Sequence, residues 1–437
     1  MEQCIESNTK IKTFKMFTIS IILLAIMDYC LLYVIKIPFG LSKYWSQYDK
    51  TLLALIAIFI VIFASQSDTK LLTRNKFLFS YFVILVVSFI ILTLISRLYY
   101  PLQTLTNTFR QWSGYLLVML AFPMLKLFID QHGYNRMFYW LNRIVFIYYV
   151  IIIFQRIIYN TSGVFFLTLD ENIRNETIRI ILGSLGDWMI LYNFDNWFCK
   201  RNNDKRWFSF VQTVLGLYCL LVVQQTRAFT LTICICMFVI VLMNSTSPKK
   251  TLRNILLIIV AFLVLVYSGF LGSFLNTFIE NNIEYSGSAI ARLSATNYYW
   301  RVFFSNPLFG QGIIAHEAYF FIEHGALGIY NYSDVGIIGL LAQIGLFIVP
   351  IYIWPLLRWG RISIGIAMKK EYRKEWGFIV AMYAYLLCTT PTLIITNVGR
   401  IFLFPFYFAI NEYIVYLFNV EITSKLSINS RQRKQND

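Results

Sequence analysis

Charged side chains are scarce in this chain of 437 residues. They make up 14% of it, whereas a soluble domain carries about 25%. Hydrophobic residues account for 58% and aromatic residues for 18%, and soluble domains average about 45–50% apolar residues. This balance excludes a soluble enzyme, a disordered protein and a nucleic-acid-binding domain. The net charge of +16 then indicates basic cytoplasmic loops of a membrane protein.

Cysteine and histidine are also scarce. The chain has seven cysteines, none of them in a CxxC pair, and three histidines. Disulfide frameworks and metal sites need such residues in clusters at short spacing. The sequence therefore predicts no disulfide framework and no bound metal, and we expect no cofactor.

Apolar runs are abundant instead. A membrane helix takes about 20 apolar residues, so residues 1–437 form a single integral membrane domain with no room for a separate soluble domain. Asp187 lies inside one run and is expected to line a cavity, because a charge within a membrane is a functional candidate by default. We predict an all-α polytopic fold with about twelve spans, at residues 16–36, 51–67, 77–96, 113–129, 137–158, 180–198, 207–223, 229–245, 254–274, 334–352, 376–395 and 401–418.

The basic residues are distributed unevenly among the loops. Loops rich in lysine and arginine stay in the cytoplasm. Both termini are therefore predicted to be cytoplasmic, which agrees with an even number of spans. Most of the 38 basic residues fall in every second loop, around residues 10–15, 70–76, 136, 200–206, 249–253, 358–374 and 425–434.

The cations of the opposite loops differ in kind, because nearly all of them are arginines. Guanidinium makes planar, bidentate contacts with phosphate or carboxylate and keeps its charge. We expect an anionic ligand on this outer face, although an ion pair or a lipid headgroup explains any single arginine. The set comprises Lys43, Lys50, Arg97, Arg110, Arg174, Arg179, Arg227, Arg292, Arg301 and Arg400.

One outer loop is much longer than the others. Residues 275–333 lie between two predicted spans, and long ordered loops are usually functional. This loop holds His316 and His324 and is rich in aromatic side chains. The aromatic rings either stack on sugars or form an interfacial belt.

The spacing of residues within the loop predicts two helices. Residues 288–304 have helical spacing, residues 306–307 (Asn-Pro) break that helix, and Gly310 and Gly312 form a turn. A second short helix is expected to begin within residues 316–321. A partly apolar helical loop beside the membrane would cover a cavity that holds a lipid-linked substrate.

The same segment resembles a known family. The Wzy-type O-antigen polymerase and ligase superfamily shares a pattern of arginine, aromatic helix, NPLFGxG, histidine or acid, and a GIIGLL span. This chain is similar in RLSATNYYWRVFFSNPLFGQGIIAHEAYFFIEHG, followed by YSDVGIIGLLAQIGLF, and ten residues separate Arg301 from Gly312 as in the family's Arg–ten–Gly motif. The hinge QQTRAF, with Arg227, resembles a second motif. The resemblance covers roughly residues 206–350 and the overall topology.

The resemblance implies a GT-C-like glycosyltransferase of the bacterial cytoplasmic membrane, which polymerises a surface polysaccharide such as O-antigen, capsule or exopolysaccharide. The donor would be the growing glycan on undecaprenyl diphosphate, and a new lipid-linked repeat unit would supply the attacking hydroxyl on the outer face. The implied partners are this lipid-linked oligosaccharide and membrane lipid, with a chain-length regulator and a flippase as further candidates. No nucleic acid is expected.

The resemblance also assigns substrate contacts. Arg227 would hold the diphosphate and neutralise the leaving group, unless it only snorkels to headgroups. Arg301 carries the motif, with Gly312, and is expected to bind substrate and take part in catalysis. Arg292 points to another face of the same helix and either binds substrate or pairs with an acidic residue. Arg400, at the last outer hinge, would complete an arginine cluster over the donor.

His316 is the candidate general base that takes the proton from the acceptor hydroxyl. Glu317 is adjacent and fills the same role in the alternative assignment, whereas Glu323 and His324 are weaker candidates. Asp334 opens the next span, where it either caps the helix or faces the cavity.

Two other functions fit this topology. The ligase branch of the family has Asn shortly after the loop histidine, and this chain reads His316-Glu317-Ala318-Tyr319, which favours the polymerase. A flippase for the same lipid-linked unit would place charges inside the bundle and have short outer loops. A generic transporter is disfavoured because no internal repeat is visible.

Overall fold

The computed structural model describes most of the chain. Two predicted spans, 16–36 and 254–274, lie outside the described residues apart from 19–21, and so does the start of the long loop before residue 283. The described residues are 19–21, 39–67, 70–131, 133–164, 172–174, 177–180, 182–198, 206–244, 283–325, 328–392, 394–396 and 400–436. Only the backbone is described at 39–50, 67, 130–131, 172–174, 177–178, 184, 227, 283–290 and 421–436.

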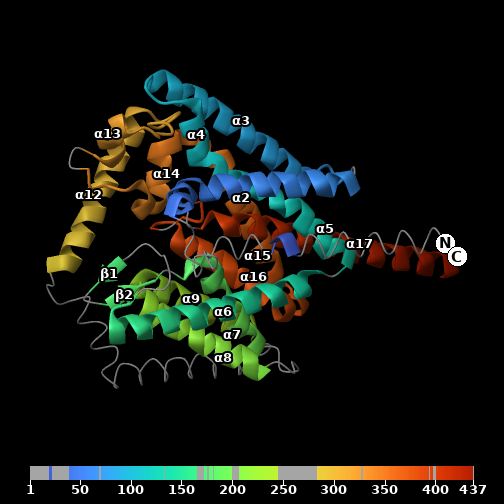
Figure 1. Ribbon diagram of the computed structural model, residues 1–437. Coiled ribbons are helices and arrows are strands. Elements are labelled where there is room, and N and C mark those ends of the chain that lie inside the picture. Colours follow the sequence, from blue (N-terminus) through green and yellow to red (C-terminus); the bar gives the residue numbers. More distant parts are fainter. Residues whose placement is uncertain are drawn as a thin grey trace. The chain divides into compact units, whose positions relative to one another are not determined.

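Helices make up nearly all of the regular structure in these ranges (Figure 1). The chain divides into two compact parts. The first part comprises Met1–Val87, Trp112–Leu185 and Val398–Asp437, and the second comprises Ser88–Gln111 and Gly186–Asn397. The helical class predicted from the sequence is confirmed. One short antiparallel hairpin is added to it, in which β1 (Asn172–Arg174) pairs with β2 (Thr177–Arg179).

In the first part, α17 and α2 pack around a common 3₁₀ segment. The helix α17 contacts α5 and η2, and α2 contacts the same two elements. The elements are α2 (Phe39–Ser67), η2 (Ser113–Leu120), α5 (Ala121–Gln131), α6 (Gly133–Ser162), η8 (Ile401–Leu403) and α17 (Phe404–Asn436), together with the start of α3 (Lys76–Tyr99).

Aromatic rings and one polar pair hold α3 against α17. The ring centroids of Tyr81 and Phe408 lie 4.4 Å apart, in a core where both side chains are fully buried. Before α3 begins, Asn75 Oδ1 accepts a hydrogen bond from the Leu78 amide at 2.9 Å, which satisfies one of the free donors of the helix N-terminus. Its Nδ2 donates to the buried carboxylate of Glu412 at 2.8 Å. A buried carboxylate is costly unless it is hydrogen-bonded, so Asn75 stabilises both helices.

In the second part, α16 packs on both α9 and α15, and α12 packs on α14 and η5 (Figure 1). The elements are the end of α3, α4 (Leu105–Trp112), α7 (Gly183–Phe198), α8 (Arg206–Tyr218), η3 (Cys219–Gln224), α9 (Arg227–Met243) and α12 (Ile283–Ser305). They continue with η4 (Glu317–Tyr319), α13 (Phe320–His324), η5 (Tyr332–Val335), α14 (Gly336–Ile344), η6 (Gly345–Phe347), η7 (Val349–Ile353), α15 (Trp354–Met368) and α16 (Lys370–Thr389).

Five helices in the described part of the chain are long and apolar enough to cross a membrane. They run over Lys76–Tyr99, Leu105–Ile129, Gly133–Ser162, Arg206–Gln224 and Ile401–Val420, and each coincides with a predicted span. Thr51–Gln66 and Ala228–Met243 are shorter apolar helices at two further predicted positions. The chain thus has the helices of a membrane protein, while the total of about twelve spans stays a prediction.

The predicted span at 334–352 falls on a bent pair of helices, and its crossing of the membrane stays a prediction. The helical stretch Tyr332–Phe347 is followed by Val349–Met368 at an angle of 113°. The backbone turns at Gly345, whose φ is +57°, and a Cβ there would lie 2.5 Å from the carbonyl oxygens of Pro307 and Leu308. The segment after the bend continues as α15, where the basic residues had indicated a cytoplasmic loop.

Two other predicted spans differ from the observed helices. The region 180–198 forms α7, which has 16 residues and is about 24 Å long at 1.5 Å per residue, short of the roughly 30 Å membrane core. Its Asp187 is buried and accepts a hydrogen bond from the Tyr385 hydroxyl at 2.6 Å. The span predicted at 376–395 ends at Thr389 in α16, since Pro391 follows closely.

Candidate site in the long loop

The long loop is built on α12, which lies along α14 in the second part of the chain. Its buried face carries Ala295 and Tyr299, which form a cluster with Val335 and Ala342. The helix ends at Ser305, because Asn306 precedes a proline and that position disfavours helical backbone. The predicted helix at 288–304 and its break are confirmed.

The arginines predicted to bind substrate, Arg292 and Arg301, are both exposed on α12. Arg301 stands directly after Trp300, whose ring stacks on that of Phe304 with centroids 5.4 Å apart and planes 18° apart. The Phe304 side chain is 70% exposed. The surface of α12 therefore presents a guanidinium beside a stacked pair of aromatic rings, of which Phe304 is exposed and Trp300 is half-buried.

The turn after α12 is pinned to α14 through backbone hydrogen bonds. The amides of Gln311 and Gly312 donate to the carbonyls of Ala342 and Gln343 at 2.7 and 3.0 Å. Gly310 and Gly312 have φ values of +62° and +80°, as the predicted glycine turn requires. A Cβ on Gly310 would lie 2.3 Å from the Ala342 oxygen, so this close approach admits only glycine.

The same turn is also held by the end of α3. The buried Ser96 Oγ accepts a hydrogen bond from the Ile313 amide at 2.7 Å and donates to the Leu92 carbonyl. The Tyr100 hydroxyl donates to the Gln311 carbonyl at 2.8 Å. A Cβ on Gly312 would lie 2.7 Å from Ser96 Oγ. Packing against Ser96 therefore requires glycine at position 312. The contact of Gly312 with substrate stays a prediction.

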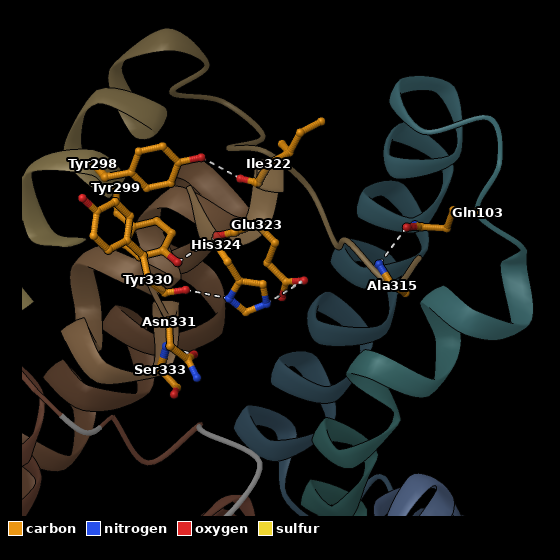
Figure 2. A network of polar contacts seen from close by, with 10 residues as sticks. All are labelled: Gln103, Tyr298, Tyr299, Ala315, Ile322, Glu323, His324, Tyr330, Asn331 and Ser333. Carbon is orange, nitrogen blue, oxygen red and sulfur yellow. Dashed lines mark hydrogen bonds and ion pairs between the residues drawn. The ribbon is translucent and has the colours of Figure 1, made fainter. Parts of the chain in front are cut away.

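Gln103 fixes the next stretch of the loop. Its Nε2 donates to the Ile313 carbonyl and its Oε1 accepts from the Ala315 amide, at 2.7 and 2.8 Å, as Figure 2 shows for the second contact. The Tyr319 hydroxyl accepts from the Leu102 amide at 3.1 Å. The segment leading to His316 is therefore held by side chains that lie more than 200 residues earlier in the chain.

His316 caps the short helix η4. Its Nδ1 accepts a hydrogen bond from the Ala318 amide at 3.1 Å. An imidazole nitrogen that accepts an N–H is unprotonated, so the proton of the neutral ring sits on Nε2. In this tautomer His316 presents a donor, and a general base must present a lone pair. Glu317 is exposed and keeps acceptor oxygens free.

Glu323 and His324 end the second short helix, α13, which the sequence places correctly. His324 Nδ1 lies 2.6 Å from the Tyr330 carbonyl oxygen, and its Nε2 lies 3.6 Å from Glu323 Oε2 (Figure 2). Burial raises the pKa of the Glu323 carboxyl, and the neighbouring imidazole acts in the opposite direction. The two side chains therefore form an acid–base pair, although the sequence alone favours His316 and Glu317 over it.

Asp334 is exposed within η5 and does not cap the helix that follows. The N-cap of η5 is Asn331, whose side chain accepts from the Ser333 amide at 3.0 Å. The capping role predicted for Asp334 is therefore wrong, because the chain enters α14 only after a turn at Gly336. A role of Asp334 towards substrate stays a prediction.

For two further candidate arginines, Arg227 and Arg400, the structure describes the position in the fold. Arg227 begins α9, as expected for a hinge residue, but its side chain lies outside the described atoms. Arg400 lies half-buried before η8 in the first part of the chain. A cluster of Arg400 with the other arginines stays a prediction.

Within the described residues no group of three or more histidine, cysteine, aspartate or glutamate side chains is arranged to hold a metal ion. The chemistry that the loop does offer is anion binding at the arginines of α12 and proton transfer at the pair on α13. No protein-family model matches this chain, and a search of curated proteins found no match.

Proposed function

We propose that this chain is a polysaccharide polymerase of the cytoplasmic membrane. It joins oligosaccharide repeat units carried on undecaprenyl diphosphate, at the outer face, without a metal or cofactor. The proposal rests on the resemblance of the loop segment to Wzy-type polymerases and on the character of the helices. The observation that carries it is the outer surface of α12, where Arg301 adjoins the stacked Trp300 and Phe304.

A lipid-linked diphosphate has two chemical parts that this surface suits. The diphosphate carries negative charge that a guanidinium fork binds in a bidentate manner. The polyprenyl tail is apolar, and exposed aromatic rings near a membrane interface bind such chains and lipid. Arg301 and the ring pair lie within one helical turn, so one ligand of this kind contacts both.

The transfer forms one bond and breaks another. The acceptor hydroxyl oxygen attacks the anomeric carbon of the donor glycan, and the bond from that carbon to the diphosphate oxygen breaks. The electron pair leaves with undecaprenyl diphosphate, and the hydroxyl proton passes to a base. Arg301 stabilises the charge that develops on the departing diphosphate.

The test is the surface-glycan profile of cells that carry Arg301→Ala at normal protein level. We expect long chains to disappear while single repeat units still reach the surface. Arg301→Lys should retain partial chain growth, because the ammonium keeps the charge but loses the bidentate fork. The matched control is Arg361→Ala, which removes an exposed arginine from α15 and should leave the profile unchanged.

Two results would reject the proposal. If Arg301→Ala also stops single units from appearing outside, export is lost, and a flippase fits better. If the glycan is elongated normally but is not moved to its final acceptor, the ligase assignment fits better.

A further inference from the structure

The Glu323–His324 pair is held against α12 by two tyrosine hydroxyls. The Tyr298 hydroxyl donates to the Ile322 carbonyl at 2.7 Å, and the Tyr299 hydroxyl donates to the Glu323 carbonyl at 2.9 Å (Figure 2). Tyr299 is fully buried in the cluster with α14. Two adjacent tyrosines therefore fix two adjacent carbonyls, and the pair is anchored to the helix that carries Arg301.

The hydrogen bonds decide which nitrogen of His324 is available. A carbonyl oxygen only accepts, so His324 Nδ1 donates to the Tyr330 carbonyl and carries the proton. In the neutral ring the lone pair is then on Nε2, which faces the Glu323 carboxylate at 3.6 Å. This is the tautomer of a general base, in which the second nitrogen is held by an acceptor.

The pair combines contact with solvent and a fixed orientation. The side chains of His324 and Glu323 are 22% and 18% exposed, so the proton acceptor remains reachable. The imidazole also packs on Phe320, with ring centroids 4.4 Å apart. His316 is also partly exposed, but it differs in tautomer, because its Nδ1 is already occupied as an acceptor.

We propose that His324 Nε2 is the base that accepts the proton of the attacking hydroxyl, and that Glu323 is the residue that positions and charge-stabilises the resulting imidazolium. The inference rests on the proposed glycan transfer and deepens it. The O–H bond of the acceptor breaks, its proton binds Nε2, and its oxygen bonds to the anomeric carbon. Loss of that proton to water restores the neutral ring.

Asparagine substitutions give a matched test for the two histidines. In His324→Asn the side-chain amide still donates to the Tyr330 carbonyl, and in His316→Asn the amide oxygen still caps the Ala318 amide. Each variant keeps its structural hydrogen bond and loses only the imidazole. Melting temperatures in detergent verify that both are folded.

The assay is chain extension by the purified full-length protein in lipid nanodiscs. The probe is the lipid-linked repeat unit extracted from cells of the same source that lack this chain. We expect His324→Asn to lower kcat by about 10²- to 10⁴-fold, which is the usual worth of a positioned base, with KM little changed. The loss in His324→Asn should exceed the loss in His316→Asn by at least tenfold.

Glu323→Gln tests the positioning role through the pH profile. Removing the carboxylate should shift the acid limb of the rate profile to lower pH, because an opposite charge no longer favours the imidazolium. The other groups that interact with Glu323 are phenols, on Tyr100, Tyr299 and Tyr332. Burial raises the pKa of Tyr100 to about 12, so this phenol is uncharged across the range. The control is Glu371→Gln, at an exposed position of α16.

The outcomes separate the two proposals. If the wild-type protein does not extend the probe, the polymerase function is rejected and this inference with it. If the wild type extends it and His324→Asn is equally fast, only the role of His324 is rejected. A larger loss of kcat in His316→Asn than in His324→Asn would instead identify His316 as the base.

Discussion

At the scale of single residues, Gly312 shows how a motif position is also a packing position. Its φ is +80°, and a Cβ at this position would lie only 2.7 Å from Ser96 Oγ, which leaves no room for a side chain. We expect Gly312→Ala to destabilise the protein by about 1–3 kcal/mol, from backbone strain and the displaced serine. Thermal unfolding in detergent measures this loss.

The control for this substitution is Gly163→Ala. Gly163 has a φ of +68°, but nothing lies within 4 Å of its Cβ position, so it reports backbone strain alone. Gly312→Ala should therefore lose more stability than Gly163→Ala. Equal losses of stability would show that the Ser96 side chain moves aside without a measurable loss of stability. A folded Gly312→Ala protein that no longer extends chains would instead support the predicted contact with substrate.

Residue identity alone predicted part of the candidate site. The glycine turn and the two loop helices follow from Gly310, Gly312 and local spacing, and the structure confirms them. Which of His316 and His324 is better suited to act as a base was not predictable, because it depends on the atom to which each Nδ1 is hydrogen-bonded. That partner is the Ala318 amide in one case and the Tyr330 carbonyl in the other, and only the folded backbone places these groups.

At the scale of elements, the packing of α12 on α14 positions the whole loop. Ala295 and Ala342 are buried where the two helices meet, and small residues allow close approach. Ala295→Leu should cost about 1–3 kcal/mol by overpacking and loosen the loop. Limited proteolysis should then cut between residues 305 and 332 faster than in the wild type. Ala291→Leu, which is half-buried on the same helix and outside that cluster, is the control, and equal cleavage of both variants would contradict this account.

Helix existence was predictable where hydrophobicity and stop signals agree. The span predicted at 77–96 is observed as α3, which ends just before Tyr100-Pro101, and α12 ends before Asn306-Pro307. The direction of the chain was not predictable, because hydropathy describes composition only. The single apolar run at 334–352 falls on two helices that meet at 113°. The residues that favour a break, Gly345 and Pro350, are present in the sequence.

At the scale of the whole molecule, sidedness rests on the distribution of lysine and arginine. The asymmetry predicts cytoplasmic termini and an outer loop at 275–333. It also assumes that the stretch after this loop crosses the membrane once before the basic residues near 358–374. The bend within that stretch allows two arrangements, since a bent pair of helices is either a broken span or a re-entrant loop.

Two exposed positions on either side of the bend distinguish these arrangements. Ile329 precedes it and is 62% exposed, and Met368 follows it and is 76% exposed. We expect Ile329→Cys to react with a membrane-impermeant maleimide in intact cells and Met368→Cys to react only after permeabilisation, measured above the labelling of the native cysteines. Reaction of both in intact cells would make the bent pair re-entrant. The number of spans after the loop would then change by one, which would move the carboxyl terminus to the outer side and overturn its predicted cytoplasmic placement.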